Sequence, residues 1–127
     1  LMAGYSVKLW TVIQDLPQIK SQYPDSWETF IGNAGVVQAF GNTDSTTLEY
    51  VSRNLGSRVI KEKKENRATP SSPLQAPDTT KSVPLLAPFE VALYGSRDTG
   101  AQFIMMAGKP PAYINRISHR EVASLDP

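Results

Sequence analysis

The polar pair Gln14-Asp15 directly follows an apolar, β-branched run from Val7 to Ile13. Such a run predicts a strand, and the acid and proline after it predict the start of a helix. Ligands of α/β sheets bind where strands end, so Gln14 is the first candidate for contact with a nucleotide phosphate. An uncharged amide can donate a hydrogen bond to phosphate and accept one from water at the same time. The simpler alternative is that Gln14 caps the helix that follows.

Two further groups of side chains could contact a nucleotide or a nucleic acid. Arg53 and Arg58 could reach a nucleotide across a subunit boundary, although surface arginines are common and no spacing singles out either one. A basic stretch follows them, and its cationic members are Lys61, Lys63, Lys64 and Arg67. Cations of this kind could bind nucleic-acid phosphates. Because glutamates in the same stretch offset much of the charge, a solvated strand end is the simpler interpretation.

Composition excludes several other kinds of site. The chain of 127 residues has no cysteine, and its single histidine, His119, rules out a multi-histidine metal site within it. A net charge of +1 selects no class of partner by bulk electrostatics. No apolar run reaches the roughly 18 residues of a membrane span, and the first residues lack the pattern of a secretory signal. We therefore expect this segment to face the cytoplasm.

The elements that must position these side chains alternate along the first 63 residues. Apolar residues at helical spacing predict three short helices, over residues 15–23, 27–33 and 45–55. Asp15 is expected to cap the first of them and either Ser45 or Asp44 the third, and Val36 to Phe40 predicts a second strand. An order of strand, helix, helix, strand and helix is typical of a largely parallel sheet.

The second half of the chain has a different character. Residues 64–82 contain three prolines and few large apolar side chains, which predicts an exposed connection. Residues 88–94 begin with Pro88 and are followed by Gly95, as is typical of a short helix. Two apolar runs, 102–107 and 112–117, flank a Gly/Pro connection that is too short for a parallel crossover, so they predict a hairpin. Trp10 and Trp27 are expected to pack in the core or on a sheet face.

At this point the order of short motifs resembles the C-terminal half of the ATPase domain of type IV secretion coupling proteins, the TraG-like conjugative DNA-transfer ATPases. The resemblance covers nearly the whole chain. It rests on the stretches Gly4-Tyr5-Ser6, Leu9 to Gln18, Trp27-Glu28-Thr29, Asn33-Ala34-Gly35, Phe40 to Asp44, Thr47 to Gly56, Pro84 to Val91 and Gly108-Lys109-Pro110-Pro111.

The resemblance implies a partial RecA-like P-loop NTPase, a three-layer α/β sandwich whose sheet is mostly parallel with a C-terminal antiparallel hairpin. Residues 1–63 would be the C-terminal half of the ATPase core, residues 64–82 an exposed linker, and residues 83–127 a terminal helix and hairpin on the same core. Family members are membrane-anchored homo-hexamers on the cytoplasmic face of the bacterial inner membrane. They use ATP and Mg²⁺ to deliver DNA or protein substrates, with the relaxosome and other type IV secretion components as partners. Gln14 would then orient the attacking water or sense the γ-phosphate.

The phosphate-binding loop of such an enzyme is missing from this sequence. No G-x-x-x-x-G-K-[ST] pattern occurs, so no loop supplies the backbone amides and the lysine that hold the β- and γ-phosphates. We expect this chain alone to bind no cofactor and to hydrolyse no ATP, as a fragment or the product of a truncated gene. The alternative function is a non-enzymatic interaction module in which the stretch from Lys61 to Arg67 binds DNA or a partner protein.

Overall fold

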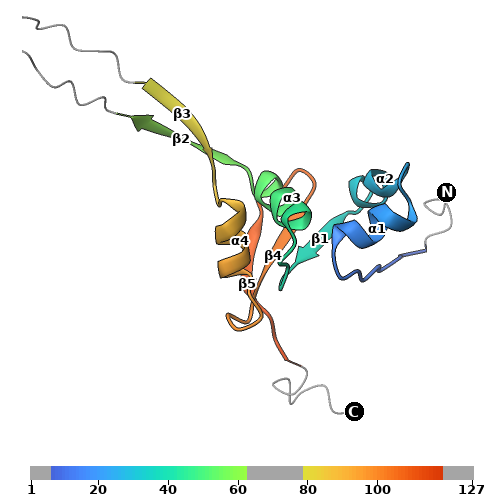
Figure 1. The fold of residues 1–127 in the computed structure, drawn as a ribbon. Coiled ribbons are helices and arrows are strands. Elements are labelled where there is room, and N and C mark those ends of the chain that lie inside the picture. The colour runs from blue at the N-terminus through green and yellow to red at the C-terminus, as the bar shows by residue number, and fades with distance from the viewer. Residues whose placement is uncertain (1–6, 63–78, 119–127) are drawn as a thin grey trace, which may run out of the picture.

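The computed structural model describes residues 7–62 and 79–118. Its elements, coloured along the chain in Figure 1, are α1 (Leu16–Gln22), α2 (Trp27–Gly32), β1 (Val36–Ala39), α3 (Ser45–Leu55), β2 (Ser57–Glu62), β3 (Thr79–Pro84), α4 (Pro88–Tyr94), β4 (Ala101–Met106) and β5 (Ala112–Asn115).

Local capping explains where the helices begin. The Asp15 carboxylate accepts a hydrogen bond of 2.9 Å from the backbone N–H of Gln18 at the start of α1. The Asp44 carboxylate accepts one of 2.8 Å from the N–H of Thr47 at the start of α3. Each bond satisfies a donor that the first turn of a helix leaves without a partner. Both caps confirm the prediction from sequence, as does the end of α3 at Gly56, whose φ of +94° favours glycine.

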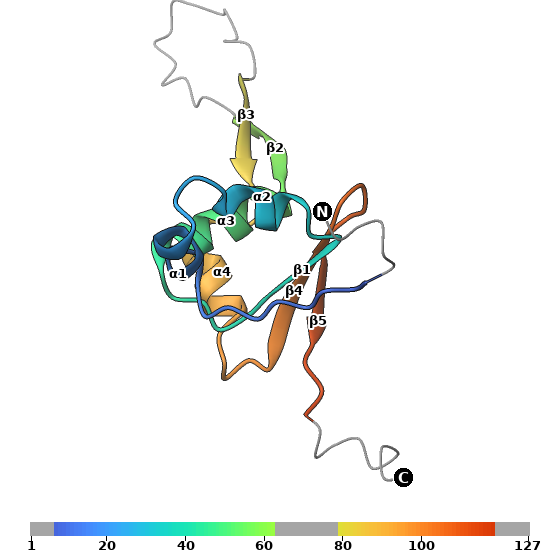
Figure 2. The same ribbon diagram turned by 90° about the vertical axis from the view of Figure 1, so that its right-hand side faces the viewer.

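The strands form two separate antiparallel sheets. In the first, β4 lies between β1 and β5, with Val37 opposite Met105 and Phe103 opposite Tyr113. The second contains β2 and β3 alone, and Figures 1 and 2 show this ribbon extending away from the helices and the first sheet. The hairpin of β4 and β5 confirms the expected antiparallel pair near residues 102–117.

The predicted mostly parallel, RecA-like sandwich is wrong, because every strand pair in the described part of the chain is antiparallel. The run from Val7 to Ile13 is in no strand, and its side chains are exposed up to Val12, Trp10 by 85%. A strand of β-branched residues gains stability only from a neighbour that pairs with it. The neighbour of β1 is instead β4, which lies more than sixty residues further along the chain.

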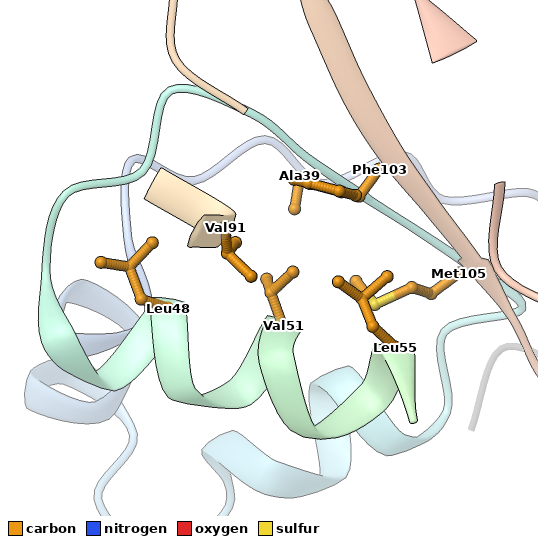
Figure 3. Close-up of a cluster of buried hydrophobic side chains, with 7 residues drawn as sticks. All are labelled: Ala39, Leu48, Val51, Leu55, Val91, Phe103 and Met105. Carbon is orange, nitrogen blue, oxygen red and sulfur yellow. The ribbon is translucent and has the colours of Figure 1, made fainter. Parts of the chain in front are cut away.

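The hydrophobic core lies between α3, α4 and the three-stranded sheet (Figure 3). Its seven buried members are Ala39, Leu48, Val51, Leu55, Val91, Phe103 and Met105. The apolar stripe predicted for α3 is confirmed, since Leu48, Val51 and Leu55 all point into this core. The expectation that Trp10 packs in the core or on a sheet face is wrong, because its ring is exposed.

The predicted linker is described only at its end. Residues 64–78 lie outside the described ranges, while residues 79–82 belong to β3 and are exposed. The division of the chain into residues 1–63, 64–82 and 83–127 stays a prediction. His119 also lies outside the described residues.

Candidate functional site

Gln14 lies on the surface just before α1, and not at the end of a strand as the sequence suggested. Its backbone N–H donates a hydrogen bond of 3.1 Å to the side-chain oxygen of Gln18. Among the described residues no hydrogen bond engages the Gln14 side-chain amide, which is free to meet solvent or a ligand. Its neighbour Asp15 is occupied as a helix cap. The role of Gln14 at a γ-phosphate stays a prediction.

The predicted basic residues do not gather around Gln14. Leu16, two residues after Gln14, donates its backbone N–H to the hydroxyl of Thr47 in the first turn of α3. Arg53 lies exposed in the last turn of the same helix. Thr47 and Arg53 are six residues apart, which separates them by about 9 Å along the axis of α3. Arg58 and Lys61 lie further away still, on the extended β2 strand. The structure therefore assembles no single nucleotide site from these residues, and Lys63, Lys64 and Arg67 lie outside the described ranges.

The structure also contains an apolar pocket of about 360 Å³, which the sequence did not reveal. It lies where the end of α3, the end of α4 and the β4–β5 hairpin meet. Its lining is Leu55, Leu85, Leu86, Tyr94, Phe103, Pro111, Ala112 and Tyr113. We call it the apolar pocket. A concave site with mostly aliphatic and aromatic walls is suited to receive an apolar group of a ligand or partner.

Two hydrogen bonds hold the walls of the apolar pocket in place. The buried Ser52 hydroxyl donates to the backbone oxygen of Leu86 at 2.6 Å, which ties one wall to α3. The Tyr113 hydroxyl donates to the backbone oxygen of Tyr94 at 2.9 Å, which ties β5 to the end of α4. No local sequence pattern predicts these contacts, because each joins residues at least nineteen positions apart. The pocket is therefore a product of tertiary packing.

Among the described residues, burial of Tyr50 raises the pKa of its phenol above the ordinary value of 10.0. A neutral tyrosine is not a general base at pH 7. Over residues 7–62 and 79–118 no group of three or more His, Cys, Asp or Glu side chains could hold a metal ion.

Arg116 and Phe40 form a contact that sequence reasoning also missed. The guanidinium carbon lies 4.6 Å from the centre of the Phe40 ring, and one guanidinium N–H donates to the backbone oxygen of Arg97 at 2.9 Å. A cation stacked on an aromatic ring and hydrogen-bonded to a loop stabilises that loop. This arginine therefore braces the end of the sheet against the loop after α4.

Among the described residues, every helix is too short or too polar to span a lipid bilayer. A comparison with curated proteins found no match. Residues 1–94 match the protein family described as the TraM recognition site of TraD and TraG. That match spans most of the chain and includes α1 to α4, and it agrees with the resemblance to TraG-like coupling proteins. The chain belongs to the family of the TraM recognition site of TraD and TraG.

Proposed function

We propose that this chain recognises TraM on behalf of a TraD- or TraG-type coupling protein in conjugative DNA transfer. The observation that carries the proposal is the family match over residues 1–94. The stretches that resemble coupling proteins, such as Gln14 to Gln18 and Phe40 to Asp44, lie within the same residues. A recognition role also suits a surface that offers an apolar pocket.

The apolar pocket is the site we propose for an apolar side chain of TraM. Protein interfaces draw most of their binding energy from a few large apolar or aromatic groups that fill such pockets. Leu85 lines the pocket and has 44% of its surface exposed, so a partner bound there would cover it. Tyr94 and Tyr113, which are also exposed, contribute aromatic side chains to the same lining.

Titration calorimetry of the chain with purified TraM tests the proposal. We expect saturable binding, and we expect Leu85→Asp to weaken it at least tenfold, because a carboxylate would lose its hydration in an apolar contact. The matched control is Leu93→Asp on α4, since Leu93 is exposed by 61% and does not line the pocket. Absence of TraM binding would overturn the proposed function. Equal losses of TraM affinity in Leu85→Asp and Leu93→Asp would instead overturn the assignment of the apolar pocket as the TraM site.

We further propose that the full-length protein is an ATPase that binds ATP and Mg²⁺. It would act as a homo-hexamer on the cytoplasmic face of the bacterial inner membrane, with DNA, the relaxosome and other type IV secretion components as partners. The support is the resemblance to coupling proteins. A phosphate-binding loop would have to come from sequence outside this chain, which lacks the pattern. Gln14 would contact the γ-phosphate or the attacking water. Arg53 and Arg58 would be candidates for contact with a nucleotide bound by a neighbouring subunit.

A further inference from the structure

Two arginines from different parts of the chain meet at the turn that follows β1. Arg97 lies in the loop between α4 and β4, and Arg116 directly follows β5. The turn itself consists of Phe40 and Gly41, and both arginine side chains lie against it. Because β1, β4 and β5 are antiparallel, these segments share one end of the three-stranded sheet. Two guanidinium groups are therefore placed at that end.

The guanidinium of Arg116 is held in one orientation. Its carbon lies 4.6 Å from the centre of the Phe40 ring, and its Nη2 donates to the backbone oxygen of Arg97 at 2.9 Å. The backbone N–H of Arg116 donates to the oxygen of Gly100 at 2.6 Å. An arginine fixed in this way loses little further conformational freedom when its remaining donors bind a ligand.

One donor of this guanidinium is left without a partner. Nε of Arg116 is buried, and no acceptor lies within hydrogen-bond distance of it among the described residues. Buried polar groups of folded proteins are nearly always hydrogen-bonded, so an exception indicates that water, an ion or a ligand completes the site. A guanidinium carries five N–H donors in a planar fork, which suits an acceptor with two oxygens.

The side chain of Arg97 lies across Gly41. A Cβ atom built at Gly41 would be 3.1 Å from Cγ and 3.4 Å from Nε of Arg97, so this approach depends on glycine. The backbone N–H of Gly41 donates to the oxygen of Gly95 at 2.7 Å, which holds the turn against the loop that carries Arg97. The Arg97 side chain is exposed, and within residues 7–62 and 79–118 it takes part in no hydrogen bond or ion pair. Its charge is therefore available to an external partner.

We infer that Arg97 and Arg116 form a binding site for an acidic side chain of a protein partner. The planar fork of arginine matches the geometry of a carboxylate, and two arginines at one turn can each donate to the same carboxylate group. The site is separate from the apolar pocket, to whose lining neither arginine contributes. The inference goes beyond TraM recognition and does not depend on it.

Local charge favours a single carboxylate over a polyanion. Asp98 directly follows Arg97 and is exposed, and Asp44 ends the segment that begins with Phe40 and Gly41. In the part of the chain that the structure covers, neither acid forms an ion pair with the arginines. A polyphosphate drawn to the arginines would also meet these two negative charges, whereas one carboxylate can bind without them. We therefore expect an acidic side chain to bind more tightly than inorganic phosphate.

NMR titration of the full chain with a blocked tripeptide, acetyl-Gly-Glu-Gly-amide, tests the inference. The Nε–Hε resonance of each arginine reports on its own guanidinium. Arg53 on α3 and Arg58 on β2 are internal controls, because both are exposed and lie on other elements. We expect the resonances of Arg97 and Arg116 to shift saturably and those of the controls to shift little. Acetyl-Gly-Gln-Gly-amide, which has no charge, and inorganic phosphate at equal ionic strength should both bind more weakly.

Two variants test the arginines one at a time. Arg116→Lys keeps the positive charge but removes the planar fork, and we expect the affinity for the glutamate peptide to fall about tenfold, as the loss of a charge-assisted hydrogen bond does. Arg97→Gln should weaken binding about two- to fivefold, because exposed ion pairs are weaker. The matched control Arg53→Gln removes the same charge from α3 and should keep the wild-type affinity.

Arg97→Gln keeps the test decisive if Arg116→Lys disturbs the loop, because the Arg97 side chain makes no hydrogen bond or ion pair with the described fold. Wild-type affinity in Arg97→Gln would overturn the inference. Shifts at Arg53 and Arg58 as large as those at Arg97 and Arg116 would do the same, since the peptide would then bind arginines without selection. Tighter binding of phosphate than of the glutamate peptide would also overturn it.

Discussion

The side-chain hydroxyl of Thr47 accepts a hydrogen bond of 3.0 Å from the backbone N–H of Leu16, 31 positions earlier in the chain. Both residues are buried. The bond joins the start of α1 to the first turn of α3, so one hydroxyl fixes how the N-terminal helix meets the core helix. A buried N–H that loses its acceptor has no water to replace it.

Replacing Thr47 by valine should therefore destabilise the protein. Thr47→Val keeps the shape of the side chain and removes the acceptor, which leaves the Leu16 N–H unsatisfied. We expect the free energy of unfolding to fall by about 1–3 kcal/mol in urea denaturation. Thr47→Ser keeps the hydroxyl and should lose less. A valine variant as stable as the wild type would show that water reaches this N–H.

Gly95, which directly follows α4, has no room for a side chain. A Cβ atom there would lie 2.8 Å from Cε2 of Phe103 and 2.9 Å from the backbone oxygen of Val91. Because Phe103 is buried in the core and Val91 contributes backbone, neither can move freely. We expect Gly95→Ala to cost about 1–3 kcal/mol and to lower the melting temperature measured by circular dichroism.

Gly32 at the end of α2 provides the matched control for this substitution. No atom lies within 4 Å of a Cβ built at Gly32, and its φ is not positive. Gly32→Ala should leave the free energy of unfolding unchanged or raise it by up to about 1 kcal/mol, since alanine favours helix. If both alanine variants lost the same stability, the close approach of Phe103 to Gly95 would not be the cause.

Tyr50 should make stability depend on pH in the alkaline range. Burial raises the pKa of Tyr50 in the folded state above 10.0, so the folded protein keeps this proton to higher pH than the unfolded chain does. The resulting stabilisation is present below pH 10.0 and is lost as pH rises from there through the folded-state pKa. Tyr50→Phe cannot ionise. The unfolding free energy of the wild type minus that of Tyr50→Phe should therefore fall above pH 10.0, and a constant difference would contradict the assignment.

Gln14→Ala in the full-length protein tests the proposed role at the γ-phosphate. A contact made mainly in the transition state affects kcat more than nucleotide binding. We expect ATP binding to stay nearly intact and kcat to fall by about tenfold to a thousandfold, as removal of one positioned polar group does. Steady-state hydrolysis and nucleotide titration measure the two quantities separately. An unchanged kcat would return Gln14 to a purely structural role before α1.

The helices could be predicted from sequence because their signals are local. Asp15 and Asp44 supply caps within three residues of the donors they satisfy, and Gly56 ends α3 through its own backbone conformation. The β4–β5 hairpin was predictable for the same reason, since a short connection leaves few ways to pair its strands.

Strand pairing over long separations was not predictable in this way. The partner of β1 is β4, and nothing near Val36 in the sequence indicates that Met106 will lie opposite it. The run from Val7 to Ile13 has the composition of a strand, but composition does not supply a neighbouring strand. The apolar pocket escaped prediction similarly, because its walls come from segments that meet only after α3, α4 and the hairpin have packed.

The placement of Phe103 and Met105 in the core limits how far this protein can be truncated from its C-terminal end. The family match ends at residue 94, but two of the seven core side chains and the central strand β4 come after that point. A polypeptide limited to residues 1–94 would leave α3 and α4 without the β4 side chains they pack against, and β1 without its partner. The boundary of the recognition family and the boundary of the cooperative folding unit are thus different, and we expect only the longer span to unfold as a single two-state domain.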